Sequence, residues 1–311
     1  MSPMATRREF LKASAVTAGV LLTEVPRLSA LAAIGGPVFG CWPDGPDYST
    51  MVQLENKLGL RFGAFRERGG KDLNRPLYTD DMVKAVQGGR QASLEINCRV
   101  NKQQYISYDR VISGDFDPQI RANARQARAL STANGKHLIE LQSEVSTPGH
   151  VSGPPEKYKA FCARIDRLFR EEGARDRVLF VLSNPRPTWL TGESKAHISP
   201  VHDVFAADGY GTTLNDNSFA SIATAVRATA ASYGKKWGVF ETGVQENIAG
   251  GKPNWLNGLG NFVDQYAGSC VGVFYNHSSD GGGPGFGNWW LDSSSTSLTA
   301  ARQLMNRSFW G

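Results

Sequence analysis

The chain has 311 residues, of which 41% are apolar and 20% charged, and it contains 34 glycines and 15 prolines. This composition excludes a disordered or coiled-coil chain and is typical of a soluble globular protein. The 34 Lys and Arg residues exceed the 29 Asp and Glu residues by 5. So mild an excess, with no basic run after Lys12, argues against a nucleic-acid partner.

The first 32 residues have the pattern of an export signal. Segment 6–12, TRREFLK, precedes a modest apolar stretch, 13–22, and a small-residue triplet, 30–32. Such a pattern describes a secretory signal, and its paired arginines resemble the twin-arginine type. We therefore expect residues 1–32 to be removed, the mature domain to span 33–311, and the protein to be secreted or periplasmic. No later segment approaches the ~18 apolar residues of a membrane span, so no membrane association is expected after cleavage.

Four scattered cysteines carry no metal-binding pattern. They show neither C-x-x-C nor Cys/His spacing, which argues against a zinc site. An exported chain can pair its cysteines, whereas buried free thiols are equally natural in apolar surroundings. Disulfide pairing therefore stays open for Cys41, Cys98, Cys162 and Cys270.

Short apolar runs bounded by turn residues recur along the mature chain and alternate with helical patterns. The eight runs are 37–42, 61–66, 93–99, 137–144, 178–183, 204–208, 237–241 and 271–276. The clearest helical patterns are 119–133, 156–172 and 218–232. Eight strand–helix units in about 280 residues predict an α/β fold, a single-domain (β/α)8 TIM barrel. The alternative is a doubly wound open sheet, which is disfavoured because no G-x-G-x-x-G follows the first run.

Two glutamates end predicted strands at the edge where barrel enzymes carry their active sites. Glu144 ends the fourth run and Glu241 ends the seventh, which faces it across the barrel mouth. Alternation along run 137–144 places Glu144 on the polar face, toward the barrel axis. Glu140 lies on the same face but deeper, and we interpret it as a buried ion-pair partner.

A pair of carboxylates at one mouth suits glycoside cleavage. One carboxyl group must stay protonated to donate to the leaving oxygen, while the other is ionised to attack the anomeric carbon or activate water. Their separation decides between retention and inversion, and the sequence does not give it. The alternative for each glutamate is a charge paired with a rim arginine. We favour catalysis because Tyr210, at the end of the sixth run, lies between the two glutamates.

Other residues at this edge are candidate substrate contacts. Aromatic rings offer flat apolar platforms for sugar faces, and arginines bind the carboxylates of acidic polymers in a bidentate manner. Each also has an ordinary structural interpretation, as a core residue, a polar rim residue or an ion-pair partner of Glu140. The candidates are Trp42, Arg66, Arg99, Asn184, Tyr210, His277, Trp289 and Trp290.

Short motifs through most of the mature chain resemble glycoside hydrolase family 26, whose members are retaining (β/α)8 hydrolases. The matching segments are 111–120 (VISGDFDPQI), 169–185, 207–210 (ADGY), 239–243 (VFETG) and 290–294 (WLDSS). By this resemblance Glu144 would be the acid/base, Glu241 the nucleophile and Tyr210 a hydrogen-bond partner of the nucleophile. The resemblance also implies endo-hydrolysis of β-1,4-mannan or a related specificity.

The segment around the predicted acid departs from the family pattern. Family members usually carry His-Glu-Met-Asn-Gly there, whereas this chain has Ser-Glu-Val-Ser-Thr over residues 143–147. Because the acid is retained and its neighbours are not, the resemblance implies catalysis more firmly than it implies mannan as the substrate.

The sequence therefore predicts an exported glycoside hydrolase that cleaves a polysaccharide or oligosaccharide by double displacement. This chemistry requires no cofactor and no metal, and we expect a monomer. Two alternatives stay open, namely a non-catalytic carbohydrate-binding barrel and a transglycosylase of the same fold. The sugar, its linkage and endo or exo action are not readable from the sequence.

Overall fold

The computed structural model describes residues 36–43, 48–67, 71–101, 104–130, 135–147, 153–212, 218–279 and 288–311. The predicted export signal lies outside the described residues, so it stays a prediction. None of the described helices is long and apolar enough to cross a membrane.

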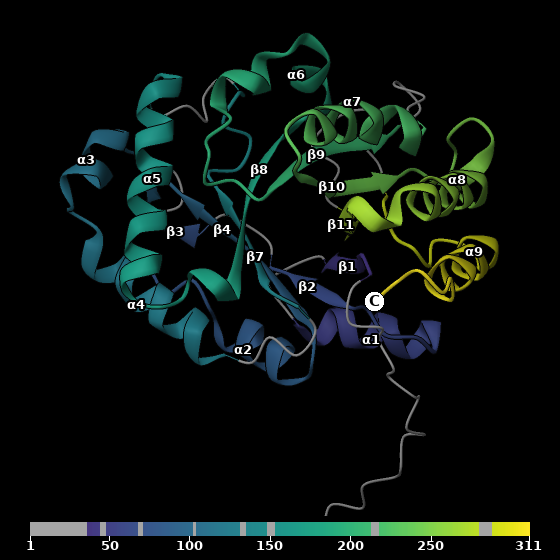
Figure 1. The fold of residues 1–311 in the computed structure, drawn as a ribbon. Coiled ribbons are helices and arrows are strands. Elements are labelled where there is room, and N and C mark those ends of the chain that lie inside the picture. The colour runs from purple at the N-terminus through teal and green to yellow at the C-terminus, as the bar shows by residue number, and fades with distance from the viewer. Residues whose placement is uncertain are drawn as a thin grey trace, which may run out of the picture. The chain divides into compact units, whose positions relative to one another are not determined.

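Eight parallel strands close into a barrel (Figure 1). In order around the ring they are β1 (Val38–Pro43), β2 (Ala64–Arg66), β4 (Gln91–Asn97), β7 (His137–Leu141), β8 (Val178–Pro185), β9 (Val204–Gly211), β10 (Lys236–Val244) and β11 (Cys270–His277). Strand β11 pairs with β1, which closes the ring. The predicted (β/α)8 barrel is thereby confirmed, and the open-sheet alternative is wrong because no edge strand remains within this ring.

Shorter strands lie beside the barrel. Strand β3 (Lys71–Asp72) pairs with the end of β4, while β5 (Arg99–Val100) and β6 (Gln104–Tyr105) form a small antiparallel hairpin. The predicted strand 61–66 begins three residues before β2, and two other predicted strands run past the observed ends. Strand β4 ends at Asn97, so Arg99 belongs to the hairpin, and β7 ends at Leu141, so Glu144 lies three residues beyond its strand.

Helices alternate with the barrel strands and surround them (Figure 1). They are α1 (Tyr48–Leu58), α2 (Asp80–Gln87), α3 (Tyr108–Ser113), α4 (Asp117–Ala129), α5 (Pro155–Glu171), α6 (Arg186–Thr191), α7 (Phe219–Ser232), α8 (Gly251–Tyr266) and α9 (Ser295–Met305). The sequence marks several helix starts. Thr79, Ser218 and Ser294 cap α2, α7 and α9 by accepting a hydrogen bond from a backbone N–H of the first turn.

The barrel interior changes from apolar to charged along the strands. Its apolar part consists of Val38, Ala64, Leu138, Val181, Val204, Ala206, Phe240 and Phe274. Because inward positions recur every second residue, the next inward residues of β2, β7 and β9 are Arg66, Glu140 and Asp208. The packed lower barrel thus supports a layer of buried charges directly beneath the mouth.

Candidate active site

Arg66, at the end of β2, holds together the buried charges of the mouth. Its side chain is fully buried and contacts three carboxylates from three other strands. The guanidinium donates to Glu140 through Nη1, to Glu95 Oε1 at 2.5 Å and to Glu241 Oε1 at 3.3 Å through Nη2. Burial alone lowers the pKa of Arg66, but these carboxylates outweigh burial and raise it well above its ordinary value. Arg66 therefore remains a cation fixed inside the barrel.

Glu241 faces the barrel axis because β10 is irregular at this point. The pairing of β10 with β9 and with β11 shifts register around Phe240 and Glu241, as a β-bulge does. In a regular strand these neighbours would face opposite sides, yet Phe240 packs in the barrel interior and Glu241 contacts Arg66. The bulge therefore turns the Glu241 side chain, which is 16% exposed, into the mouth.

Two side chains donate hydrogen bonds to the Glu241 carboxylate. Arg66 reaches Oε1, and the Tyr210 hydroxyl reaches Oε2 at 3.4 Å. Asn276 Nδ2 donates to the same hydroxyl at 3.3 Å, which fixes its orientation. Burial raises the pKa of Glu241 to about 8; the Arg66 cation opposes this rise, and the charges of Glu95, Glu140 and Glu144 add to it. The hydrogen bond from Tyr210 to Glu241 is the contact that the family resemblance implies.

Further carboxyl groups are buried in the mouth, and their pKa values are raised. Burial, opposed by Arg66, raises the pKa of Glu140 to about 7. Asp208 accepts hydrogen bonds from Ser183 Oγ at 2.9 and 3.0 Å, and burial together with the charge of Glu241 raises its pKa well above the ordinary value. The interpretation of Glu140 as a buried ion-pair partner is confirmed by its contact with Arg66.

Glu144 reaches the mouth from a turn, not from a strand end. Gln142 and Glu144 have φ values of 63° and 50°, a left-handed conformation that residues other than glycine rarely adopt. Strand alternation therefore stops at Leu141, and the reasoning that placed Glu144 by alternation is wrong. Glu144 is nevertheless half-buried and close enough to Glu241 for its charge to raise the pKa of that carboxyl group.

Two of the predicted substrate contacts, Trp42 and Trp289, pack against Arg66 and Tyr210, the two residues that donate to Glu241. The guanidinium of Arg66 lies over the Trp42 ring, 5.3 Å from its centroid. Trp289 is almost fully buried, and its ring centroid lies 4.8 Å from that of Tyr210. Arg66 itself is an ion-pair partner with a fully buried side chain, which is the structural interpretation that the sequence left open.

Asn184, at the end of β8, is buried beside the turn that carries Glu144. Its Oδ1 accepts hydrogen bonds from the backbone N–H of Ser146 at 3.0 Å and from the Ser146 hydroxyl at 2.8 Å. Its Nδ2 has no hydrogen-bond partner among the described residues. Asn184 thus anchors the end of this turn.

His277 and Trp290 lie together at the end of β11. Their rings are perpendicular with centroids 4.6 Å apart, and His277 Nδ1 accepts a hydrogen bond from the backbone N–H of Leu291 at 3.0 Å. The fully buried Lys252 donates to the Trp290 carbonyl at 2.7 Å and lies 3.3 Å from Glu246. This cluster fixes the segment that carries both tryptophans.

Arg99, another predicted site residue, lies just beyond the end of β4. It belongs to the β5–β6 hairpin, and its Nε donates to Asp72 Oδ1 at 3.0 Å. Arg99 also donates a hydrogen bond to Tyr105 of the same hairpin, whose pKa is sensitive to the charge of Glu144. The hairpin therefore lies on the Glu144 side of the mouth.

Sequence reasoning missed Glu95 and Asn97 of β4 and did not single out Asp208. The segment 91–97 alternates polar and apolar residues, with Ser93, Glu95 and Asn97 on one face. This is the same signal that placed Glu140 inside the barrel, so the strand pattern could have found both residues.

The described part of the chain offers no group of His, Cys, Asp and Glu residues that would hold a metal ion. All four cysteines are buried free thiols, and Cys41, Cys98, Cys162 and Cys270 therefore form no disulfide in this structure.

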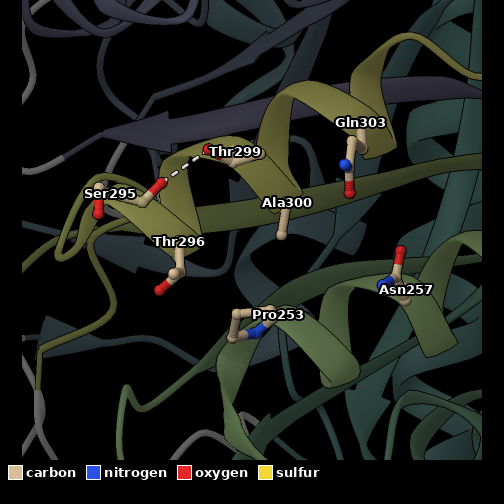
Figure 2. A pocket seen from close by; sticks show the side chains of 7 residues that line it. All are labelled: Pro253, Asn257, Ser295, Thr296, Thr299, Ala300 and Gln303. Atoms are coloured by element: carbon tan, nitrogen blue, oxygen red, sulfur yellow. Dashed lines mark hydrogen bonds between the residues drawn. The ribbon is translucent and has the colours of Figure 1, made fainter.

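A shallow surface pocket between α8 and α9 lies outside this site (Figure 2). Its lining offers neither an aromatic ring nor a charged group for sugar chemistry, so we assign the site to the barrel mouth. The lining residues are Pro253, Asn257, Ser295, Thr296, Thr299, Ala300 and Gln303.

Solved structures of mannanases resemble this chain. A family 26 β-mannanase from Bacteroides ovatus is 18% identical, with a TM-score of 0.60 over 89% of this chain and 90% of that chain. The catalytic domain of a family 26 endo-β-1,4-mannanase from a Bacillus species is 13% identical, with a TM-score of 0.62 over 88% and 87%. A family 26 protein from a Muricauda species is 13% identical, with a TM-score of 0.61 over 90% and 88%.

The chain shares its fold with glycoside hydrolase family 26. The resemblance noted in the sequence motifs therefore extends to the architecture of nearly the whole described chain. No family model matches the sequence, and no curated protein matches it. The similarity to family 26 structures therefore supports the fold alone. Any argument about the reaction must come from the residues of the barrel mouth.

Proposed function

We propose that this protein is a retaining glycoside hydrolase, with Glu241 as the nucleophile and Glu144 as the acid/base. The observation that carries the proposal is the Glu241 carboxylate, which a bulge turns into the mouth and which receives a hydrogen bond on each oxygen from Arg66 and Tyr210. Such donors fix the orientation of a carboxylate for in-line attack. A binding protein has no need of a carboxylate held in this way.

In the proposed mechanism a Glu241 oxygen attacks the anomeric carbon and forms a glycosyl ester, while the leaving oxygen takes the proton of Glu144. Glu144 then removes a proton from water, and the water oxygen displaces Glu241 from the sugar. The transition states carry positive charge on the sugar ring, which the buried carboxylates of the mouth stabilise.

We infer a neutral polysaccharide or oligosaccharide as the substrate. Arg66, the arginine next to Glu241, is already shared among three carboxylates of the chain, so it offers little attraction to an acidic polymer. Two of the similar structures are mannanases, which makes β-mannan the first polymer to test. Export by the twin-arginine route and a monomeric state remain part of this proposal.

The test is a reducing-sugar screen of the purified protein on mannan, glucans, xylans, arabinogalactan and uronic-acid polymers. Release by the wild type but not by Glu241→Ala supports the hydrolase and names its substrate. Glu171→Ala, which removes a surface carboxylate from α5, serves as the matched control and retains activity. Binding of one polymer without hydrolysis would instead support the carbohydrate-binding barrel. Products longer than the substrate would support the transglycosylase.

The variant Glu144→Ala distinguishes the proposed role of Glu144 from that of Glu241. The variant slows phenyl glycosides, which need a proton on the leaving oxygen, far more than dinitrophenyl glycosides, which do not. Equal losses on both substrates would remove Glu144 from the acid/base role.

A further inference from the structure

We propose that Asn97 is a positioning residue that couples the two glutamates of the mouth. Its side-chain amide connects two parts of the site. One is the ion-pair cluster that holds Glu241, and the other is the turn that carries Glu144. This inference rests on the proposed function, since it assigns a task within that reaction.

Asn97 is the last residue of β4, and it is 4% exposed. Its Nδ2 donates a hydrogen bond to Glu95 Oε2 at 3.2 Å. Its Oδ1 accepts a hydrogen bond from the backbone N–H of Ser143 at 2.9 Å. One buried amide thus serves a carboxylate on one side and a backbone N–H on the other. An ionised aspartate of similar size provides only acceptors, and an apolar side chain provides neither a donor nor an acceptor.

On the first side, Glu95 connects Asn97 to the proposed nucleophile. Glu95 Oε1 accepts a hydrogen bond from Arg66 Nη2 at 2.5 Å, and the same nitrogen donates to Glu241 Oε1 at 3.3 Å. The Asn97 donor occupies the other Glu95 oxygen and limits rotation of this carboxylate. Arg66 Nη2, which contacts Glu241, is therefore held in place by Glu95, and Glu95 is held in turn by Asn97.

On the second side, Ser143 lies between the two left-handed residues Gln142 and Glu144. Each such residue costs on the order of 1 kcal/mol of backbone strain, so the turn needs fixed contacts to persist. Within the turn, the N–H of Gln142 donates to Ile96 O at 2.9 Å, and that of Glu144 donates to Ser183 O at 3.1 Å. The N–H between them is the one held by a side chain, that of Asn97.

The turn is also the place where the sequence departs from family 26, because Ser143 stands where the family usually has His. The contacts of Asn97 give this chain its own means of fixing the residue before the acid. Misplacement of Glu144 would impair proton donation, and misplacement of Arg66 would impair attack by Glu241. The two faults have different kinetic signatures.

The experiment compares Asn97→Ala and Asn97→Asp with the wild type on dinitrophenyl and phenyl glycosides of the sugar found in the polysaccharide screen. Hydrogen–deuterium exchange at the Ser143 amide is measured in the same proteins. Asn123→Ala is the matched control, since Asn123 is 5% exposed and also accepts a backbone hydrogen bond, from Leu77 N at 3.0 Å in the outer helical layer.

Asn97→Ala removes both hydrogen bonds, so we expect kcat/KM to fall by about threefold to tenfold on the dinitrophenyl glycoside and by about a further tenfold on the phenyl glycoside. Exchange at Ser143 becomes faster. Asn97→Asp retains the acceptor for Ser143 N–H but places a carboxylate against Glu95. It therefore leaves exchange at Ser143 slow and lowers kcat/KM on both glycosides by the same factor. Asn123→Ala changes neither the glycoside ratio nor the exchange at Ser143.

Equal losses on the two glycosides in Asn97→Ala, or unchanged exchange at Ser143, would overturn the positioning role and leave the proposed hydrolase intact. A wild-type protein that hydrolyses neither glycoside nor any polymer would overturn the proposed function itself, and the coupling role with it. The two failures are thereby distinguished.

Discussion

Replacing Glu140 by glutamine tests the charge balance of the mouth. Burial raises the pKa of Glu140 from 4.5 to about 7 in the folded protein. Between these values the folded state holds a proton that the unfolded state has lost, so the free energy of unfolding falls as pH rises from 4.5 through about 7. The difference between the two pKa values corresponds to about 3 kcal/mol at pH 8. Glu140→Gln abolishes this titration, so its stability relative to the wild type should improve by up to about 3 kcal/mol between pH 5 and pH 8.

The assay is urea unfolding of both proteins at pH 5, 6, 7 and 8, with the midpoint and the slope fitted at each pH. Glu55→Gln provides the contrast, because Glu55 forms a buried ion pair with Arg90 in the outer layer, through Arg90 Nη2 and through Arg90 Nε at 3.2 Å. That change should destabilise the protein at all four pH values, since it leaves a buried cation without its partner. A stability difference between Glu140→Gln and the wild type that stays constant from pH 5 to pH 8 would refute the reasoning.

Three further predictions concern the supports of the site. Lys252→Met removes donors to the Trp290 carbonyl and Ser293 and should lower the free energy of unfolding by about 1–3 kcal/mol, measured by urea unfolding. Gly243→Ala places a methyl group about 3.2 Å from Trp289, so polymer hydrolysis should fall while the fold, followed by circular dichroism, persists. Burial lowers the pKa of His202 from 6.5 to about 3, so the unfolded state binds the proton first. The wild type should therefore lose about 3 kcal/mol more stability than His202→Gln as pH falls from 7 to 4, measured by urea unfolding at each pH.

The barrel could be predicted because each strand must bury one face against helices and the other inside the ring. Residues 137–141 show this directly. Ile139 and Leu141 pack in the outer layer, whereas Leu138 and Glu140 point into the barrel. The same alternation placed carboxylates at the mouth, and the strand-end rule then selected Glu241. Local pattern and global architecture agree at these positions, which is why the sequence sufficed.

The local irregularities of the site could not be predicted. The bulge at Glu241 is visible only as a register shift between neighbouring strands, and the turn at Glu144 uses left-handed residues that are not glycine. Neither feature has a signature in spacing or hydropathy. The partners of Arg66 could not be predicted either. From the sequence alone, its guanidinium could pair with a glutamate of the chain or bind a carboxylate of the substrate.

The surplus of carboxyl groups around Arg66 makes physical sense for one kind of reaction. Burying Glu95, Glu140, Asp208 and Glu241 within one barrel mouth is unfavourable unless cations or protons compensate, and Arg66 is shared among three of them. A substrate that gains positive charge in its transition state relieves the repulsion among these carboxylates. The uncharged substrate in the ground state does not relieve it, so the transition state is stabilised selectively. An oxocarbenium-like sugar has that property, whereas an acyl or phosphoryl group gains negative charge and would be repelled. The cluster of buried carboxyl groups therefore supports the proposed glycosyl transfer by an argument separate from the fold shared with family 26.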